Sequence, residues 1–290
     1  MSEYVIMSDS CCDLPADFAK ALNIDTVPLI VNLNNVEYKN YLDEREITLS
    51  AFYKGLRKGY TAFTSAANAD MFITQMTPYL ENGQDIVYIG LSSLLSVTYQ
   101  NACMAAEELK ENYPDRTIVC IDSRCASLGQ GLLLCLAAKE KASGKNLEEL
   151  TAHVQETIPH ICHWFTVDDL HFLKRGGRIS SATASFGSIL HIKPILRLND
   201  EGGIVSADKA RGRGTSIKAL YQKLTESAMD ISGQTVMICH ADCSEDADYL
   251  ANKIKNALNP ADIIISPIGP VIGAHAGPGA IAVFFIGDKR

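Results

Sequence analysis

Short apolar runs alternate with amphipathic segments along the first half of the chain. Runs rich in β-branched and aromatic residues predict strands over residues 4–10, 26–33, 85–92 and 117–123. Apolar residues at helical spacing predict helices over residues 15–23, 48–58, 68–81 and 97–112. Strands that are apolar on both faces and separated by helices favour a parallel sheet with helices on each side. The first half is therefore predicted to be a Rossmann-like α/β domain with a largely parallel sheet.

Two further helical patterns, over residues 126–143 and 147–158, follow this alternation. Gly144 is expected to end the first of these helices, and Asn146 is expected to be the N-cap of the second. We therefore expect a domain boundary near residue 160, which divides the chain into domains 1–160 and 161–290.

The second half has a different order of elements. Predicted strands cover residues 164–169, 192–199, 204–210, 234–241, 262–269 and 280–287, with helices near 215–230 and 245–258. The second and third of these strands are joined by Asp200-Glu201-Gly202-Gly203, which is typical of a hairpin. An antiparallel hairpin beside strands separated by helices predicts an α/β domain with a mixed sheet.

Composition and charge narrow the class of protein. The chain has 290 residues, of which 47% are hydrophobic and 21% are charged, as in a globular protein. Its net charge of −8 argues against a broad surface for nucleic acid. The longest apolar runs, 128–138 and 280–287, are shorter than the roughly 20 residues of a membrane span. Nine cysteines and no recognisable export signal predict reduced thiols in a cytoplasmic protein.

Three polar stretches are candidates for a ligand site: residues 63–68 ahead of a helix, 90–99 between a strand and a helix, and 273–279 before the last strand. Ligands of open α/β sheets collect at the carboxyl ends of strands, where helix N-termini and hydroxyl groups favour anions. His275 adds a further donor. The alternative for each serine is simple N-capping, and for the histidine a turn whose backbone satisfies the ring.

Taken together in this order, the three stretches resemble the TSxP-type, SSxLSGTYQ-type and GxHxGPG-type motifs of the DegV family. Supporting matches are the segments 8–15, 122–123 and 173–180. The resemblance implies two α/β domains with a long-chain fatty acid in a tunnel between them. It also implies a carboxylate site formed by Thr64, Ser96 and His275, to which Ser65, Ser92 and Ser93 are close enough to contribute.

The chain departs from the family pattern at two places near this site. Val97 stands where the family has glycine, and Ala66-Ala67 replace Gln-Pro. A β-branched residue disfavours a positive φ, so Val97 is expected to crowd the backbone near the anion.

A fatty-acid carboxylate is charged at neutral pH, and protonation of His275 would strengthen its hydrogen bond to the ligand. The tail requires an apolar wall, to which the segment 185–196 is expected to contribute. Ordinary core packing is the alternative reading of that segment.

The resemblance also implies that the bound fatty acid is presented to a separate fatty acid kinase. The chain itself has no GxxxxGK[ST] loop and no HRD or DFG-like signature. Arg211, within a basic stretch, matches the position of a kinase-docking arginine, and a solvated hairpin end is the alternative. We predict a lipid-binding protein without enzymatic activity of its own and without a cofactor.

Other functions fit the sequence less well. Ser93, Asp122 and His275 occur in the order of a serine hydrolase triad, but Gly90-Leu91-Ser92-Ser93-Leu94 lacks the second glycine of a nucleophile elbow. Neither Cys239-His240 with Cys243 nor the stretch 160–163 has the spacing of a metal site, so no metal is predicted. Gly129-Gln130-Gly131 continues into leucines of a predicted helix, unlike a dinucleotide-binding loop.

Overall fold

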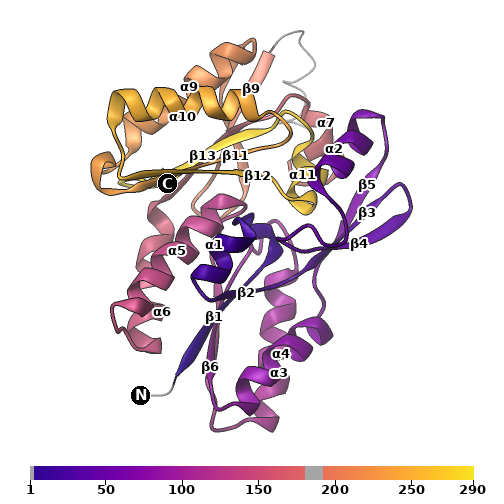
Figure 1. The fold of residues 1–290 in the computed structure, drawn as a ribbon, viewed down its shortest axis with the longest axis vertical. Helices are drawn as coiled ribbons and strands as arrows, with labels where there is room; N and C mark the ends of the chain where they lie inside the picture. Colours follow the sequence, from indigo (N-terminus) through magenta and orange to yellow (C-terminus); the bar gives the residue numbers. More distant parts are fainter. Residues whose placement is uncertain (1–2, 180–191) are drawn as a thin grey trace.

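A four-stranded parallel sheet forms the centre of the first half (Figure 1). The computed structural model describes residues 3–179 and 192–290. The sheet has the order β2-β1-β6-β7, and its strands are β1 (Tyr4–Asp9), β2 (Ile24–Val27), β6 (Asp85–Gly90) and β7 (Ile118–Asp122). The short helices η1 (Ser10–Cys12) and α1 (Ala16–Ala21) connect β1 to β2. The predicted parallel sheet is confirmed.

Helices cover both faces of this sheet. Two pack on one face, α3 (Ala69–Glu81) and α4 (Thr98–Asn112), and two lie on the other, α5 (Leu128–Ala142) and α6 (Leu147–Thr157). Asn146 caps α6 in a capping box with Glu149, and Gly144 follows the end of α5 with a φ of +98°. The predicted ends of these two helices are confirmed.

The second half contains a six-stranded mixed sheet, in the order β10-β9-β8-β13-β11-β12. Its strands are β8 (Ile161–Thr166), β9 (Ile192–Leu198), β10 (Ile204–Arg211), β11 (Thr235–His240), β12 (Asp262–Pro267) and β13 (Ile281–Ile286). Among the described strands of this sheet, only the β11–β12 pair is parallel. Helices α9 (Arg213–Ser227) and α10 (Ser244–Leu258) cover its outer face (Figure 1). The predicted mixed sheet and hairpin are confirmed, while the boundary near residue 160 stays a prediction.

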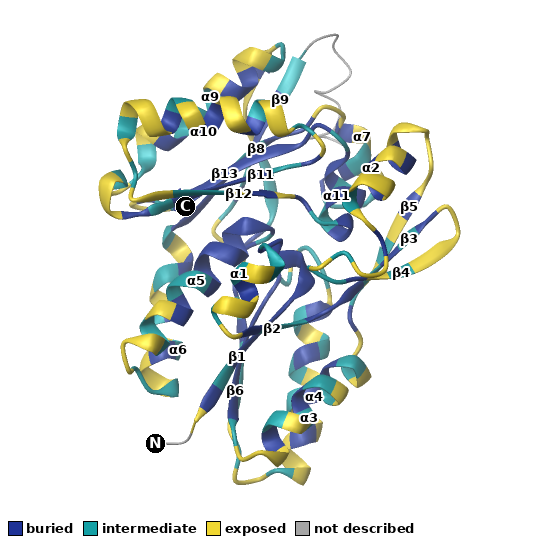
Figure 2. Ribbon diagram, viewed as in Figure 1, coloured by how far each residue is buried: buried dark blue, intermediate teal, exposed yellow. Residues whose placement is uncertain are grey.

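Helix α5 packs against both sheets, which explains why its sequence is apolar on nearly all sides. Two glycines allow this close approach. A Cβ at residue 129 would lie 2.0 Å from His163 Nε2, and a Cβ at residue 131 would lie 2.9 Å from the carbonyl oxygen of Cys12. The glycines of Gly129-Gln130-Gly131 therefore serve packing inside a helix. Figure 2 shows α5 and the central strands as buried, with exposed residues on the outer helices.

The prediction of one strand over residues 26–33 is wrong. Pro28 divides this run, because β2 ends at Val27 and β3 (Leu29–Leu33) joins a separate antiparallel sheet in the order β4-β3-β5. Strands β4 (Val36–Asn40) and β5 (Ala62–Ser65) were not predicted. A two-residue turn at Asn34 and Asn35, both with positive φ, connects β3 to β4.

Three shorter helices complete the framework: α2 (Leu49–Arg57), α7 (Leu170–Arg175) and α11 (Pro270–Ala276). The first was predicted over residues 48–58. The other two fall in stretches where strands or loops were expected. Within the described residues, no helix is long and apolar enough to cross a membrane.

Candidate functional site

A cavity of about 510 Å³ lies at the carboxyl end of β6 and extends to strands of the six-stranded sheet. Its walls are mostly apolar and come from both halves of the chain, with Leu29, Leu91, Leu95, Phe165, Ile204 and Phe284 among them. The volume is typical of a small-molecule site. Of the predicted lining segment 185–196, residues up to 191 lie outside the described residues, and β9 begins at Ile192. The cavity offers a long apolar ligand a place between the two sheets.

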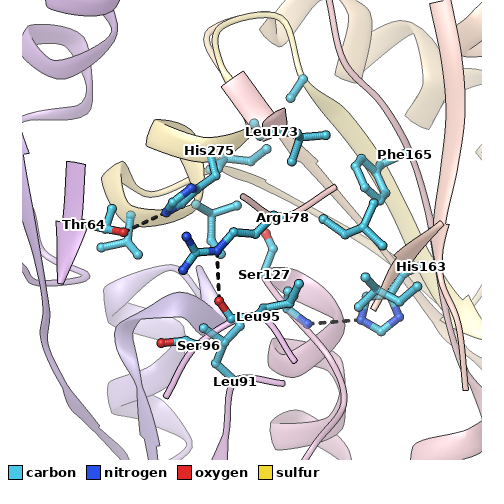
Figure 3. Close-up of a pocket in the computed structure, with 18 of the residues that line it drawn as sticks. Thr64, Leu91, Leu95, Ser96, Ser127, His163, Phe165, Leu173, Arg178 and His275 are labelled. Atoms are coloured by element: carbon cyan, nitrogen blue, oxygen red, sulfur yellow. Dashed lines mark hydrogen bonds between the residues drawn. The ribbon is translucent and has the colours of Figure 1, made fainter. Parts of the chain in front are cut away.

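Thr64 and His275 meet at one end of this cavity. Thr64 lies on β5 and His275 on α11, and the Thr64 Oγ1 to His275 Nε2 distance is 2.7 Å (Figure 3). The other ring nitrogen, Nδ1, is buried without a partner in the described structure. A buried N–H without an acceptor is unfavourable, so the proton belongs on Nε2, which donates to Thr64. The hydroxyl hydrogen of Thr64 is then free to point into the cavity.

Burial keeps the His275 ring neutral. Burial is the largest cause, and together with the nearby guanidinium groups of Arg178 and Arg175 it lowers the pKa of His275 to about 4. The ring also packs against Gly176, since a Cβ at that position would lie 2.1 Å from Nδ1. At neutral pH the free site therefore holds an uncharged imidazole, while protonation of His275 in the presence of a bound carboxylate stays a prediction.

The positive charge at this end of the cavity comes from Arg178. Its Nε donates to the carbonyl oxygen of Leu95 at 3.0 Å, and one of its terminal nitrogens donates to the carbonyl oxygen of Gly176. The guanidinium is half-buried, and desolvation lowers its pKa. Within residues 3–179 and 192–290, no carboxylate forms an ion pair with it. In Figure 3, Arg178 lies between the Thr64–His275 pair and Ser96.

The loop after β6 contributes serines whose roles differ. Ser93 and Ser96 line the cavity. Ser92 instead donates to the carbonyl oxygen of Gly202 at 2.9 Å, and its own carbonyl oxygen accepts the N–H groups of Leu95 and Ser96. Ser92 therefore stabilises the loop and does not line the cavity.

Ser96 Oγ lies 2.8 Å from the Thr98 hydroxyl and accepts the Thr98 N–H at 3.2 Å. With both of these groups donating, the Ser96 O–H can point into the cavity. Val97 has a φ of −76°, an ordinary value for any residue, and its side chain is 60% exposed. The backbone at this position therefore does not need the positive φ of a glycine, while Val97 lines the cavity and its crowding of a bound anion stays a prediction.

The remaining predicted residues lie at the edges of the cavity or away from it. Ser65 lines the cavity from an exposed position at the end of β5. Arg211 is exposed at the end of β10 and does not line the cavity. Asp122 accepts the backbone N–H groups of Ser93 and Arg124, at 3.2 and 2.9 Å. In the described structure neither Ser93 nor Asp122 is hydrogen-bonded to His275, so the three do not form a hydrolase triad.

Polar groups elsewhere on the cavity wall already have partners in the protein. The ring of His163 accepts the Ala126 N–H through Nε2 and donates through Nδ1 to the carbonyl oxygen of Ile161. Burial lowers its pKa well below the usual value, so the ring is neutral. Ser127 donates to Asp13 at 2.5 Å. Among the described residues, no group of three or more His, Cys, Asp or Glu side chains could hold a metal ion.

The order of these groups along the chain matches a known family. A family model described as an uncharacterised protein of the DegV family matches residues 3–288. The chain belongs to the DegV family. A DegV domain-containing protein of Clostridium perfringens is 45% identical to this DegV-family chain over 290 residues, which cover 100% of the chain and 99% of the relative.

Solved structures of DegV proteins share the fold. A DegV family protein from Thermus thermophilus, described for fatty acid binding, has 28% identity and a TM-score of 0.89, covering 98% of this chain and 99% of its own. The fatty acid kinase B3 protein of Streptococcus pneumoniae, solved with linoleic acid, has 20% identity and a TM-score of 0.85, covering 99% of this chain and 100% of its own. At that identity the likeness to the second protein shows the fold alone.

Sequence reasoning missed the position of Arg178 in the cavity wall. The segment Leu173-Lys174-Arg175-Gly176-Gly177-Arg178 was noted only as a supporting match. The two consecutive glycines before the arginine are the sequence feature that could have indicated its position. Gly176 leaves room for the His275 ring, and Gly177, with a φ of +71°, turns the chain at the end of α7. The turn places Arg178 in the cavity wall.

Proposed function

We propose that this DegV-family protein binds a long-chain fatty acid, with the tail in the apolar cavity and the carboxylate at the end formed by Thr64, Ser96, His275 and Arg178. Ser93 and Ser65 also line the cavity and are available as further donors. The observation that carries the proposal is Arg178, a half-buried cation without a carboxylate partner in the described structure, at the polar end of an otherwise apolar cavity. A partly desolvated charge is stabilised by an opposite charge, which the ligand carboxylate would supply.

The carboxylate and the hydrocarbon tail of the fatty acid contribute differently to the binding free energy. Each methylene removed from water contributes about 0.8 kcal/mol, before the cost of ordering the chain is subtracted. A charged hydrogen bond contributes about 1.5–3 kcal/mol. The apolar wall therefore supplies most of the affinity, while the polar end selects acids over alcohols and esters.

Native mass spectrometry of protein purified from bacterial cells tests this function. We expect one bound fatty acid per chain, which organic extraction removes and added fatty acid restores. Protein that carries no fatty acid and takes up none after extraction would contradict the proposal. Thr64→Val, Ser96→Ala and His275→Ala should each weaken loading while leaving the fold intact, and normal loading in all three would place the carboxylate elsewhere.

We further propose that the loaded protein presents its fatty acid to a separate ATP-dependent fatty acid kinase in the cytoplasm. The exposed position of Arg211, outside the cavity wall, supports a role in docking. Arg211→Glu should leave loading unchanged and reduce phosphorylation of the bound fatty acid by the kinase. The neighbouring exposed residue Lys209→Glu is a control for charge alone. Unchanged phosphorylation of the Arg211 variant would contradict the docking role.

A further inference from the structure

The segment Asp9 to Asp13 is hydrogen-bonded to all three elements that carry the proposed carboxylate site. These are the loop after β6, the small sheet that contains β5, and the residues that lead into α11. The segment comprises the end of β1 and the helix η1, and its three polar residues Asp9, Ser10 and Asp13 are buried. None of them lines the cavity. We refer to Asp9, Ser10 and Asp13 as the brace.

Asp9 holds the start of the loop that carries Ser93 and Ser96. Its Oδ2 accepts the backbone N–H of Leu91 at 2.8 Å, and the same oxygen accepts the hydroxyl of Tyr88 at 2.8 Å. Its Oδ1 accepts the N–H of Cys11 at 3.1 Å and so fixes the carboxylate relative to η1. The loop therefore leaves β6 in a direction set by Asp9.

Ser10 holds the sheet that carries Thr64. Its Oγ accepts the backbone N–H of Leu29, the first residue of β3, at 3.0 Å. The same oxygen accepts the side-chain amide of Asn40, the last residue of β4, at 3.1 Å. Strand β3 pairs in turn with β5, where Val31 lies opposite Thr64. Ser10 thus fixes the small sheet at the ends of two strands.

Asp13 holds the helix that carries His275. Its Oδ1 accepts the backbone N–H of Gly269, the residue before α11, at 3.0 Å. A Cβ at residue 269 would lie 2.6 Å from this oxygen, so the contact requires glycine. The Asp13 backbone oxygen accepts the hydroxyl of Ser266 at 2.9 Å. These bonds connect the first half of the chain to the second, directly behind α11.

We propose that the brace is a positioning element, which sets the relative placement of the serine loop, of Thr64 and of His275 without touching the ligand. This inference rests on the proposed fatty-acid binding. The three elements come from segments far apart in sequence, and the brace is bonded to each of them. Loss of a brace residue should therefore weaken recognition of the carboxylate and leave burial of the tail unchanged.

The test compares affinity for a long-chain fatty acid with affinity for the primary alcohol of the same length. The ratio of the two reports the head-group site, because the alcohol shares the tail and lacks the charge. Asp13→Gly removes the carboxylate and tolerates the φ of 51° at this position, and Asp13→Asn keeps an oxygen acceptor for Gly269. Ser10→Ala removes the acceptor for β3. Ser8→Ala is the matched control, because Ser8 is a buried serine on β1, next to the brace, whose hydroxyl donates to the carbonyl oxygen of Ile89 and accepts from Gln130.

We expect Asp13→Gly and Ser10→Ala each to lower the acid-to-alcohol ratio about tenfold, the loss of one well-placed hydrogen bond, with alcohol affinity little changed. Asp13→Asn should retain most of the ratio, and Ser8→Ala all of it. A wild-type ratio near one would contradict the proposed function itself. The positioning role of the brace would be overturned by either of two results. One is a wild-type protein that prefers the acid and two brace variants with the same acid-to-alcohol ratio, and the other is an equal loss of acid and alcohol affinity in the variants. If one of the two brace variants fails to fold, the acid-to-alcohol ratio of the other variant tests the proposal.

Discussion

Replacement of Arg178 by glutamine is the most direct test of the carboxylate site. The change removes the only cation at the polar end of the described cavity wall, while an amide can still donate to the carbonyl oxygen of Leu95. Loss of Arg178 removes one cause of the low pKa of His275, but burial, the largest cause, remains, so we expect the imidazole to stay neutral and not to replace the lost charge. The variant therefore isolates the contribution of charge from that of shape.

The size of the effect follows from the burial of Arg178. Two unit charges about 4 Å apart attract by about 1 kcal/mol in water and by about 4 kcal/mol near a protein surface of effective dielectric constant 20. The half-buried guanidinium lies between these limits, and charged hydrogen bonds contribute about 1.5–3 kcal/mol. A loss of about 2 kcal/mol corresponds to a roughly 30-fold weaker affinity for the fatty acid. The alcohol carries no charge, so its affinity should hardly change.

Isothermal titration calorimetry with the fatty acid and with its alcohol measures both quantities on one protein. Arg197→Gln is a matched control, because this half-buried arginine on β9 also donates to a backbone carbonyl, that of Leu198 at 3.3 Å, and lies outside the cavity wall. We expect the control to bind both ligands as the wild type does. An Arg178→Gln protein that retains the wild-type preference for acid over alcohol would refute the assignment of the carboxylate to this end.

Three further predictions follow from contacts elsewhere. Gly176→Ala places a methyl group 2.1 Å from the present position of His275 Nδ1 and should lower fatty-acid affinity about tenfold by displacing the ring, whereas Gly214→Ala, with nothing within 4 Å, should bind normally. Burial raises the pKa of Asp13 from 3.8 to about 7, so the native state retains a proton that the unfolded state loses, and the free energy of unfolding falls as pH rises through this range. Asp13→Asn should remove this dependence and gain up to about 4 kcal/mol above neutral pH, as measured by urea unfolding; an unchanged slope would show that Asp13 does not titrate there. Hydrogen bonds from Cys120 and Tyr99 lower the pKa of Cys103, whereas burial raises the pKa of Cys135 to about 12, so iodoacetamide at neutral pH should label Cys103 before Cys135. Equal labelling of the two would contradict this assignment.

The regular elements of the fold could be predicted from the sequence, because their apolar residues repeat with a constant spacing over many residues. Helices α3 and α4 begin and end within one residue of the predicted ranges 68–81 and 97–112. Their caps and their apolar stripes are local signals. The hairpin of β9 and β10 was equally local, since the two strands are joined by a short polar turn. Predictions of this kind need no knowledge of which elements meet in space.

The small sheet was missed because its signals are weak or shared. Strand β4 is short and mostly exposed, so apolar alternation is absent, and β5 holds only four residues. Pro28 separates two strands that read as one apolar run. As a consequence Thr64 was expected in a loop before a helix, while it lies on a strand beside His275. The pair is brought together by pairing and packing across 211 residues of sequence, which a local pattern does not encode.

The charge state of the site explains which head group it suits. Arg178 contributes one positive charge, and the His275 ring is neutral because burial and the two nearby arginines oppose its protonation. A single carboxylate therefore brings the described polar end to neutrality, and no ion remains unpaired in an apolar environment. An alcohol would leave the guanidinium without a counter-ion, and a phosphate monoester, with a charge of about −1.5 to −2, would add a negative charge that nothing opposes. In the proposed site, burial and the arginine that would bind the carboxylate both keep the histidine of the free site neutral, which favours a singly charged acid as the ligand.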